Sequence, residues 1–281
     1  MIKKIVIIFS FLLCISCQNF GQLKLVADLP KDLEEVSGTE IVPKSNLIWM
    51  VNDSGNKPTL FGLNEKGKII KEIYIKAKNH DWEDLTSDEK GTIYIGDFGN
   101  NVSKRKNLSI IIVEQNELDE KNAEVDEIEF EYPNQTKFPP KKKNLYFDAE
   151  SFFYFNNALY IFTKSRVKEN YGKTTLYKIP AKKGKYIAEI VDEFENCTDI
   201  ECWITSADIS PNGKKVVLLS QNKVLIFTDF IGDKFLSGKV ETIDLTHRSQ
   251  KESITFKDNN TLLISDEKAH GTGGNLYELK I

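Results

Sequence analysis

The chain has 281 residues, a formal net charge of −4 and a charged fraction of 28%. This mildly acidic balance, with no long basic block, argues against a protein that binds a nucleic-acid backbone, so we expect no nucleic-acid partner. The length is enough for one substantial core and lies near the upper size of a single all-β domain.

Residues 1–17 have the features of a secretory signal. Lys3 and Lys4 precede an apolar run from Ile5 to Leu13, which is too short to span a bilayer as a mature helix. The following "CISC" resembles the lipobox of bacterial lipoproteins, in which the cysteine becomes lipidated. We therefore predict lipidation at Cys17 and a membrane-anchored protein that faces the periplasm or the cell surface. Secretion after cleavage near "NFGQ" is the alternative.

Residues 18–281 contain five copies of one pattern, and we interpret them as one domain. Each copy has an acidic residue at the head of a short apolar strand, a tight polar turn such as "DEKG" or "PNGK", and a second strand of β-branched or aromatic residues. The acidic heads are Glu35, Glu83, Glu150, Asp208 and Glu252. The second strands end at Asp53, Asp97, Lys164, Gln221 and Asp266.

Third and fourth strands follow in most copies. The third strands are "TLFGL", "SIIIV", "TLYKI", "KVLIF" and "NLYEL", and the fourth are "IIKEIYI", "EIEFEY", "YIAEIVDEF" and "KVETIDL". The fifth copy lacks a fourth strand, and "QLKLVADL" at 22–29 has the character of the missing one. The pattern predicts an all-β fold, a single β-propeller of five four-stranded blades closed by the N-terminal strand. Six blades, or two β-sandwich domains, are the alternatives.

The acidic heads indicate a metal site. In a four-stranded meander the innermost strand starts on the face where the second strand ends, so all five acidic heads are expected to converge near the propeller axis. Asp53, Asp97 and Asp266 should reach the same face. Neighbouring carboxylates repel one another, and a divalent cation with oxygen ligands removes that cost; calcium suits many ligands in loose geometry. The alternative is that these acids cap strand ends or line a water-filled tunnel.

Rare residues gather in the loops of the same face. The three arginines, Arg105, Arg166 and Arg248, indicate an anionic or planar ligand held by forked hydrogen bonds. Trp82 could stack on a flat ligand or sugar, as could Trp203, although packing in the core is the alternative for both.

Three further residue types complete the set of candidate residues. His80 and Asp81 are the candidates for moving a proton. Cys197 and Cys202 are expected to form a disulfide, because an exported protein is folded in an oxidising compartment. The lysine run "PPKKKN" at 139–144 is interpreted as a solvated loop.

A family resemblance covers most of the mature chain. "DWEDLTSDEKGTIYIGDFGNN", "DAESFF", "ITSADISPNGKKVVLLS" and "KESITF" resemble secreted bacterial propeller proteins grouped with the phytase-like esterase domain and the NHL/lactonase-type propellers. The resemblance implies a metal-compatible channel and hydrolysis of esters or phosphoesters. The acidic, arginine-bearing face and the lipid anchor predict a monomeric surface lipoprotein that binds a glycan, a peptide or a small anion around a divalent cation. The alternative is a metal-dependent hydrolase of an ester, lactone or phosphoester.

Overall fold

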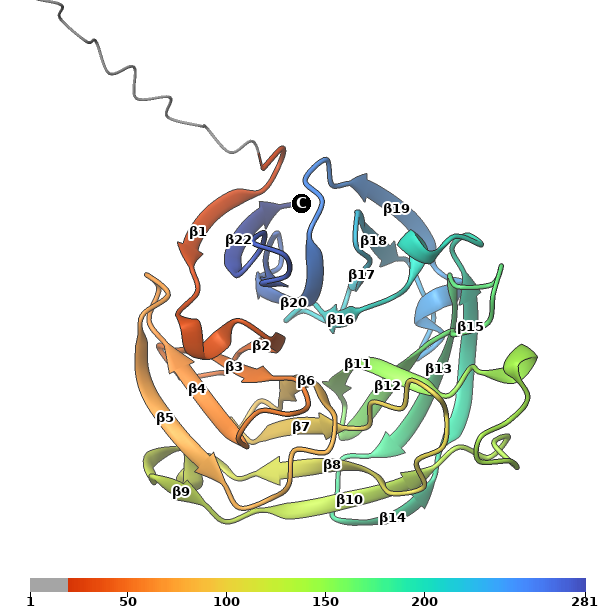
Figure 1. Ribbon diagram of the computed structural model, residues 1–281, viewed down its shortest axis with the longest axis horizontal. Helices are drawn as coiled ribbons and strands as arrows, with labels where there is room; N and C mark the ends of the chain where they lie inside the picture. The colour runs from red at the N-terminus through yellow and green to blue at the C-terminus, as the bar shows by residue number, and fades with distance from the viewer. Residues whose placement is uncertain (1–19) are drawn as a thin grey trace, which may run out of the picture.

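Five β-sheets form a ring around a central axis in the computed structural model, which describes residues 20–281 (Figure 1). The predicted signal segment 1–17 and the lipidation site at Cys17 lie outside the described residues. Each sheet is built on a four-stranded antiparallel meander whose first strand lies nearest the axis. The prediction of a five-bladed propeller is therefore confirmed.

The strand bounds follow the repeats in chain order. Blade 1 contains β2 (Val36–Ile41), β3 (Ile48–Asn52), β4 (Thr59–Leu63) and β5 (Ile69–Ile75). Blade 2 contains β6 (Trp82–Ser87), β7 (Ile93–Asp97), β8 (Leu108–Val113) and β10 (Asp126–Glu131). Blade 3 contains β11 (Asp148–Phe155), β12 (Ala158–Lys164), β13 (Lys173–Pro180) and β15 (Glu189–Glu195). Blade 4 contains β16 (Ser206–Ile209), β17 (Val216–Leu219), β18 (Lys223–Thr228) and β19 (Lys239–Asp244). Blade 5 contains β20 (Gln250–Asp258), β21 (Thr261–Glu267) and β22 (Asn275–Lys280).

Blade 5 is completed by the N-terminal strand, as the sequence predicts. The strand β1 (Lys24–Asp28) pairs antiparallel with β22, with Lys24 opposite Glu278 and Asp28 opposite Asn275. In Figure 1 the two ends of the described chain therefore meet in one sheet. This pairing satisfies the backbone groups of β22 that would otherwise form an open edge.

Two short strands join neighbouring blades at the outer rim. The strand β9 (Asn122–Ala123) pairs in parallel with β5, and β14 (Gly184–Ile187) pairs in parallel with β10. The predicted outer strand "YIAEIVDEF" is thus divided, because its first residues join blade 2 and the rest form β15 of blade 3.

Helical structure in the described chain is limited to short 3-10 turns: η1 (Lys31–Leu33), η2 (Gln115–Asp119), η3 (Lys142–Asn144), η4 (Ile200–Cys202) and η5 (Phe235–Ser237). No helix within residues 20–281 is long and apolar enough to cross a membrane. The structure contains the expected disulfide between Cys197 and Cys202, with Cα atoms 5.9 Å apart, beside η4.

Apolar side chains from adjacent blades pack together between the sheets. Trp49 and Trp82 lie in one such cluster with Leu85, and Phe153 and Phe235 lie in another. Burying a side chain of this size stabilises the fold by about 1.5–3 kcal/mol. Packing of blade against blade therefore leaves the axis to be lined by the polar residues of the inner strands.

We expect closure by β1 to be essential for stability. A variant that starts at Pro30 would expose the edge of β22 and lose the buried side chain of Leu23. Its melting temperature should fall on the order of 10 °C or more relative to a chain that starts at Phe20. Circular dichroism melts of the two variants test this, and equal melting temperatures would contradict it.

Candidate functional site

The inner strands carry a repeated irregularity close to their N-terminal ends. In β2, β6, β11 and β20 the pairing register skips one residue, and the skipped residues are Ser37, Glu83, Glu150 and Glu252. Such β-bulges leave one residue out of the ladder and re-aim its side chain. Counting back from the hairpin places Thr205 at the same position in blade 4. The bulge position therefore carries three glutamates and two hydroxyl residues.

The three glutamates lie close enough to influence one another. Burial is the main cause that raises the pKa of Glu83 well above its usual range, and the charge of Glu150 is the next. Burial likewise raises the pKa of Glu252 to about 7, with a smaller contribution from Glu150. Convergence of Glu83, Glu150 and Glu252 at one end of the channel thus agrees with the repeat pattern.

Glu35 and Asp208 do not belong to this set, which corrects the expected ring of five acids. Glu35 lies two residues before the bulge position, outside β2, where it is exposed and accepts a hydrogen bond of 2.6 Å from Asn56. Asp208 lies three residues beyond the bulge position, about 10 Å further along the strand. There its carboxylate accepts hydrogen bonds from the backbone N–H groups of Ile209 and Phe256.

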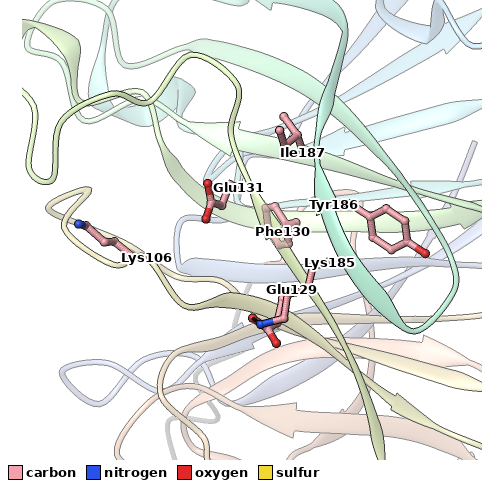
Figure 2. A pocket seen from close by; sticks show the side chains of 7 residues that line it. All are labelled: Lys106, Glu129, Phe130, Glu131, Lys185, Tyr186 and Ile187. Carbon is pink, nitrogen blue, oxygen red and sulfur yellow. Dashed lines mark ion pairs between the residues drawn. The ribbon is translucent and has the colours of Figure 1, made fainter.

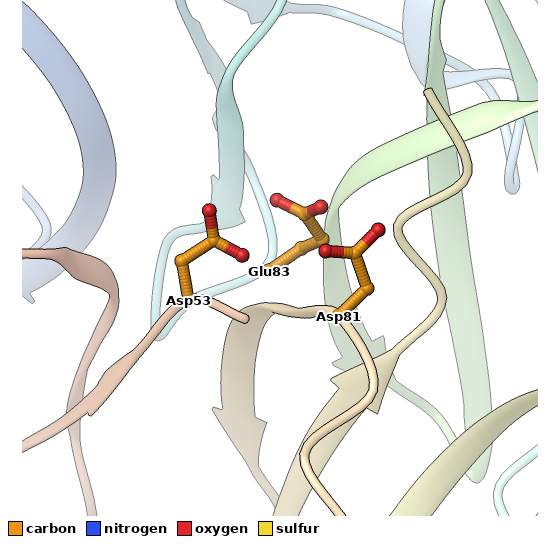
Figure 3. Close-up of side chains that lie close together, drawn as sticks. All are labelled: Asp53, Asp81 and Glu83. Atoms are coloured by element: carbon orange, nitrogen blue, oxygen red, sulfur yellow. The ribbon is translucent and has the colours of Figure 1, made fainter. Parts of the chain in front are cut away.

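A tighter carboxylate cluster lies at the junction of blades 1 and 2. One carboxylate oxygen from each of Asp53, Asp81 and Glu83 falls within 4.8 Å of the others, and Figure 3 shows the three side chains gathered there. Spacing of this kind is compatible with oxygen atoms around one calcium ion, which binds its ligands at about 2.3–2.6 Å. We call Asp53, Asp81 and Glu83 the acidic trio.

The loop that follows β5 places the acidic trio. The side-chain amide of Asn79 donates to the backbone carbonyls of Asn52 and Asp53 at 3.1 and 2.9 Å, and its oxygen accepts from the N–H of Trp82 at 3.0 Å. Asn79 therefore ties the end of β3 to the start of β6. This contact brings Asp53 of one blade beside Asp81 of the next.

Gly99 forms a wall of the acidic trio. A Cβ atom at this position would lie 2.0 Å from Oε1 of Glu83 and 2.5 Å from Oδ2 of Asp81. Only glycine lets the two carboxylates approach the backbone in this arrangement. Its carbonyl is held by Arg105 Nη1 at 2.8 Å.

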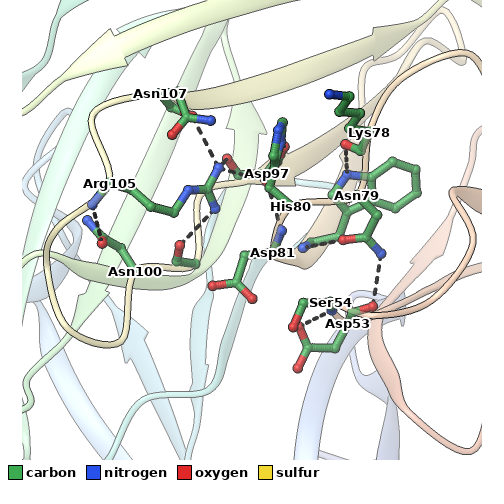
Figure 4. A network of polar contacts seen from close by, with 12 residues as sticks. Asp53, Ser54, Lys78, Asn79, His80, Asp81, Asp97, Asn100, Arg105 and Asn107 are labelled. Atoms are coloured by element: carbon green, nitrogen blue, oxygen red, sulfur yellow. Dashed lines mark hydrogen bonds and ion pairs between the residues drawn. The ribbon is translucent and has the colours of Figure 1, made fainter.

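Asp97 organises the residues behind the trio (Figure 4). Its carboxylate contacts Nδ1 of His80 at 2.6 Å, the backbone N–H of Asp81 at 3.0 Å and Nη2 of Arg105 at 2.9 Å. Nη1 and Nη2 of Arg105 are committed to protein acceptors, whereas its Nε is buried without a hydrogen-bond partner among the described residues. The His80 ring is about half exposed, and its Nε2 has no protein partner in the described part of the chain.

On the blade 3 side of the channel, the acids are neutralised by protein cations. Lys164 Nζ lies 2.8 Å from Glu150, while Arg166 contacts Asp148 at 2.6 Å and Glu150 at 2.9 Å. Lys164 and Arg166 also lie over the ring of Trp203, at 5.0 and 4.7 Å. Burial acts to raise the pKa of Glu150, but Lys164 and Arg166 outweigh it and lower that pKa.

The acidic trio lacks such partners. No lysine, arginine or histidine of residues 20–281 forms an ion pair with Asp53, Asp81 or Glu83. Burial raises the pKa of Asp53 to about 6, and burial also raises the pKa of Asp81. Positive charge is therefore unevenly shared between the two sides of the channel mouth.

Two predicted ligand-contacting residues lie elsewhere. The Trp82 side chain is fully buried between blades and donates from Nε1 to the carbonyl of Lys78 at 3.2 Å, so core packing is its role. Arg248 is exposed and pairs with Glu201 at 3.3 Å, in a separate hollow that also contains His270. Neither residue reaches the acidic trio.

Asn79 and Gly99 were not predicted from the sequence as residues of the site. Their roles depend on contacts between blades, and an isolated asparagine or glycine in a loop carries no signal of such contacts. Asp53 had a signal, because it ends a second strand and was expected on this face.

The chain is similar to several proteins of known structure, at low sequence identity. No protein-family model and no curated protein matches the chain. Among solved structures, it is similar to virginiamycin B lyase from Staphylococcus aureus, with 15% identity over 90% of this chain and 68% of the other and a TM-score of 0.44. It is also similar to the Cps50 (Swd1) β-propeller domain of Myceliophteria thermophila, with 8% identity over 88% and 96% of the chains and a TM-score of 0.47.

A third similar structure is a protein of unknown function from Bacteroides caccae, with 11% identity over 87% of this chain and 77% of the other and a TM-score of 0.48. These similarities carry no statement about activity, and the assignment of the fold rests on the strand order. Strand order and site together define a five-bladed β-propeller with an acidic channel mouth.

We expect the metal-free protein to lose stability as the pH rises. Asp53 and Glu252 have raised pKa values in the folded protein, about 6 and about 7, so folding favours their protonated forms. That contribution is fully present below about pH 4 and is lost as the pH rises through the folded values. Melting temperatures in EDTA should fall between about pH 4 and pH 7, and millimolar calcium should reduce the fall. A flat profile in EDTA would contradict this.

Proposed function

We propose that this protein is an exported lipoprotein, anchored through Cys17 and monomeric, whose propeller face binds a ligand around a divalent cation. The cation, best matched by calcium, would be held by the acidic trio. The ligand classes compatible with the site are a glycan, a peptide or a small anion. The sequence features of residues 1–17 support the export and lipid parts of this proposal.

The observation that carries the cation is the unpaired state of Glu83. The residue is only 8% exposed, and its side chain makes no hydrogen bond or close ion pair with another described residue. Arg166, which pairs with Asp148 and Glu150, acts on Glu83 only as a more distant charge. Leaving a carboxylate buried beside two others without a positive partner is costly. Glu150, at the same bulge position in the next blade, has both Lys164 and Arg166. A bound cation would supply to Glu83 the charge that these residues supply to Glu150.

A cation held only by the acidic trio would have open coordination positions for oxygen atoms of an external ligand. Calcium takes six to eight oxygen ligands, and three carboxylates provide three when each binds through one oxygen. The remaining positions suit hydroxyl, carboxylate or carbonyl oxygens of an external ligand. Asp53 and Asp81 are partly exposed, which supports access from the solvent side.

A metal-dependent hydrolase of an ester, lactone or phosphoester is the second candidate function. The observation in its favour is the contact between Nδ1 of His80 and Asp97, which orients the ring and leaves Nε2 directed away from the carboxylate. His80 could then accept a proton from water beside the trio, and the cation would polarise the bond to be cleaved. The resemblance to phytase-like esterase and NHL/lactonase-type propellers belongs with this second function.

Asp81→Asn and Glu83→Gln should have opposite effects on stability and on cation binding. Each substitution removes one of three repelling charges, so the melting temperature in EDTA should rise. Each also removes a ligand, so calcium affinity measured by isothermal titration calorimetry should fall at least about 10-fold, or about 1.4 kcal/mol. Glu65→Gln, in an exposed turn at the opposite face, is the matched control and should change neither quantity.

Gly99→Ala tests the geometry without changing the charge. The added methyl group would collide with Glu83 and Asp81, so calcium affinity should fall although all three carboxylates remain. Calcium affinity equal to that of the unmodified protein would show that the cation, if bound, lies elsewhere.

Binding and hydrolysis are separated by a turnover assay. A panel of esters, lactones and phosphoesters should be screened with calcium and with EDTA. The binding function predicts that neither the unmodified protein nor His80→Ala turns over any of these compounds. Turnover that requires the cation and is lost in His80→Ala would favour the hydrolase instead.

A further inference from the structure

The loop between blades 2 and 3, residues 132–147, has a charge that contrasts with the rest of the chain. It contains the lysines Lys137, Lys141, Lys142 and Lys143 and no acidic residue, in a protein whose net charge is −4. The loop leads from the outer strand β10 to the inner strand β11, so it lies on the face that carries the acidic trio.

Contacts at several points along the loop hold its backbone in place. Gln135 is buried and donates to the carbonyl of Ser103 at 2.8 Å, and Asn134 accepts a hydrogen bond of 2.9 Å from the hydroxyl of Tyr177. Near the other end, the N–H of Arg166 donates to the carbonyl of Leu145 at 2.8 Å. The lysines are therefore presented by a segment that the blades support at both ends, and residues 139–144 between these contacts are mostly exposed, as expected of a solvated loop.

The loop borders a partly open hollow with a volume of about 400 Å³. It is lined by the lysines Lys137, Lys141 and Lys143, the polar residues Asn134, Thr136 and Asn144, the aromatic residues Tyr146 and Phe147, and Pro140. The volume lies within the range of about 300–1,000 Å³ that is usual for small-molecule sites. We call this hollow the lysine pocket.

Positive charge in the lysine pocket is not neutralised by the protein. None of Lys137, Lys141 and Lys143 forms an ion pair with a carboxylate in the described part of the chain. A neighbouring cavity of about 210 Å³ at the outer rim differs, because its Lys185 pairs with Glu129 at 2.7 Å (Figure 2). The lysine pocket thus offers three ammonium groups to an anion, beside amide and hydroxyl groups that can bind neutral oxygens.

We propose that the lysine pocket binds an acidic saccharide, a sugar chain that bears sulfate or carboxylate groups. Lysines bind the anionic groups, and Asn134, Thr136 and Asn144 bind sugar hydroxyls. Lys173 Nζ lies over one face of the Tyr146 ring, 5.4 Å from its centroid, and a sugar ring packs against the other face. A concave, partly aromatic pocket fits a discrete sugar better than a flat membrane surface. The inference specifies the ligand class of the proposed binding function and rests on it.

Two hydrogen bonds and a short segment of chain connect the lysine pocket to the acidic trio. Gln135 joins the loop to Ser103, and Arg105, two residues further on, holds the carbonyl of Gly99 beside the acidic trio. The loop that carries the lysine pocket is therefore tied through residues 99–107 to the backbone beside the acidic trio.

The test uses the mature protein and sulfated oligosaccharides of defined length, with uncharged malto-oligosaccharides of equal length as the neutral probe. The triple variant Lys137→Gln/Lys141→Gln/Lys143→Gln should lose at least about 10-fold in affinity for the sulfated probe. Its affinity should also depend less steeply on salt, because three screened contacts are gone. The unmodified protein should bind the neutral probe much more weakly.

A matched control carries the same charge change on the opposite face. Lys66, Lys90 and Lys214 are exposed residues of hairpin turns without ion-pair partners, and the triple variant with glutamine at these positions should bind within about twofold of the unmodified protein. Melting curves check that both triple variants are folded. Equal losses in the two variants would overturn the proposal, since they would show that net charge alone attracts the probe.

Further outcomes separate this inference from the cation proposal. Loss of binding in the lysine variant with no effect of EDTA or Glu83→Gln would support the pocket and overturn the cation-dependent function. Unchanged binding of the sulfated probe by the lysine variant, together with loss of binding in EDTA, would support the cation-dependent function and overturn the lysine pocket. Binding to anionic lipid vesicles without binding to the sulfated probe would overturn the saccharide assignment.

Discussion

Hydrogen bonding between β1 and β22 is the constraint on which the molecule depends. Residues from the two ends of the described chain form one sheet, and only then do five inner strands surround a common axis. Each blade has its own hairpins, but no blade by itself brings a residue of blade 1 beside one of blade 2 and opposite one of blade 4. The contact between Asp84 and Ser206, at 3.1 Å, joins blades 2 and 4 and exists because the ring is closed.

Closure concentrates acidic side chains, and the protein neutralises them unevenly. Lys164 and Arg166 pair with the acids of blade 3, and Arg105 pairs with Asp97, whereas Asp53, Asp81 and Glu83 have no such partner. If like charges at the mouth were only a by-product of strand ends, cations would be expected to serve all of them alike. The uneven distribution favours a site at which an external cation completes the charge balance, as we propose.

The same face separates charge into two adjoining regions. The acidic trio lies by the axis, and the lysine pocket lies further out, with the loop 99–107 between them contacting both. Each region is supported by hydrogen bonds to neighbouring segments, from Asn79 and Arg105 at the trio and from Gln135 at the lysine pocket. A ligand with anionic groups and additional oxygen atoms is the kind of molecule that would contact both regions.

The sequence by itself determined the blade number, the closing strand and the disulfide pair, because hairpin turns, strand alternation and cysteine spacing are local signals that recur in each copy. It also indicated that Glu83, Glu150 and Glu252 converge. Only the tertiary structure decided that Glu35 and Asp208 do not converge with them. A β-bulge shifts the strand pairing by one residue, so the residue at the bulge position is found only by counting from each hairpin turn back along the inner strand. Asn79 and Gly99 became visible only when neighbouring blades packed together. Their roles consist of contacts between segments, and no single segment of the sequence records such contacts.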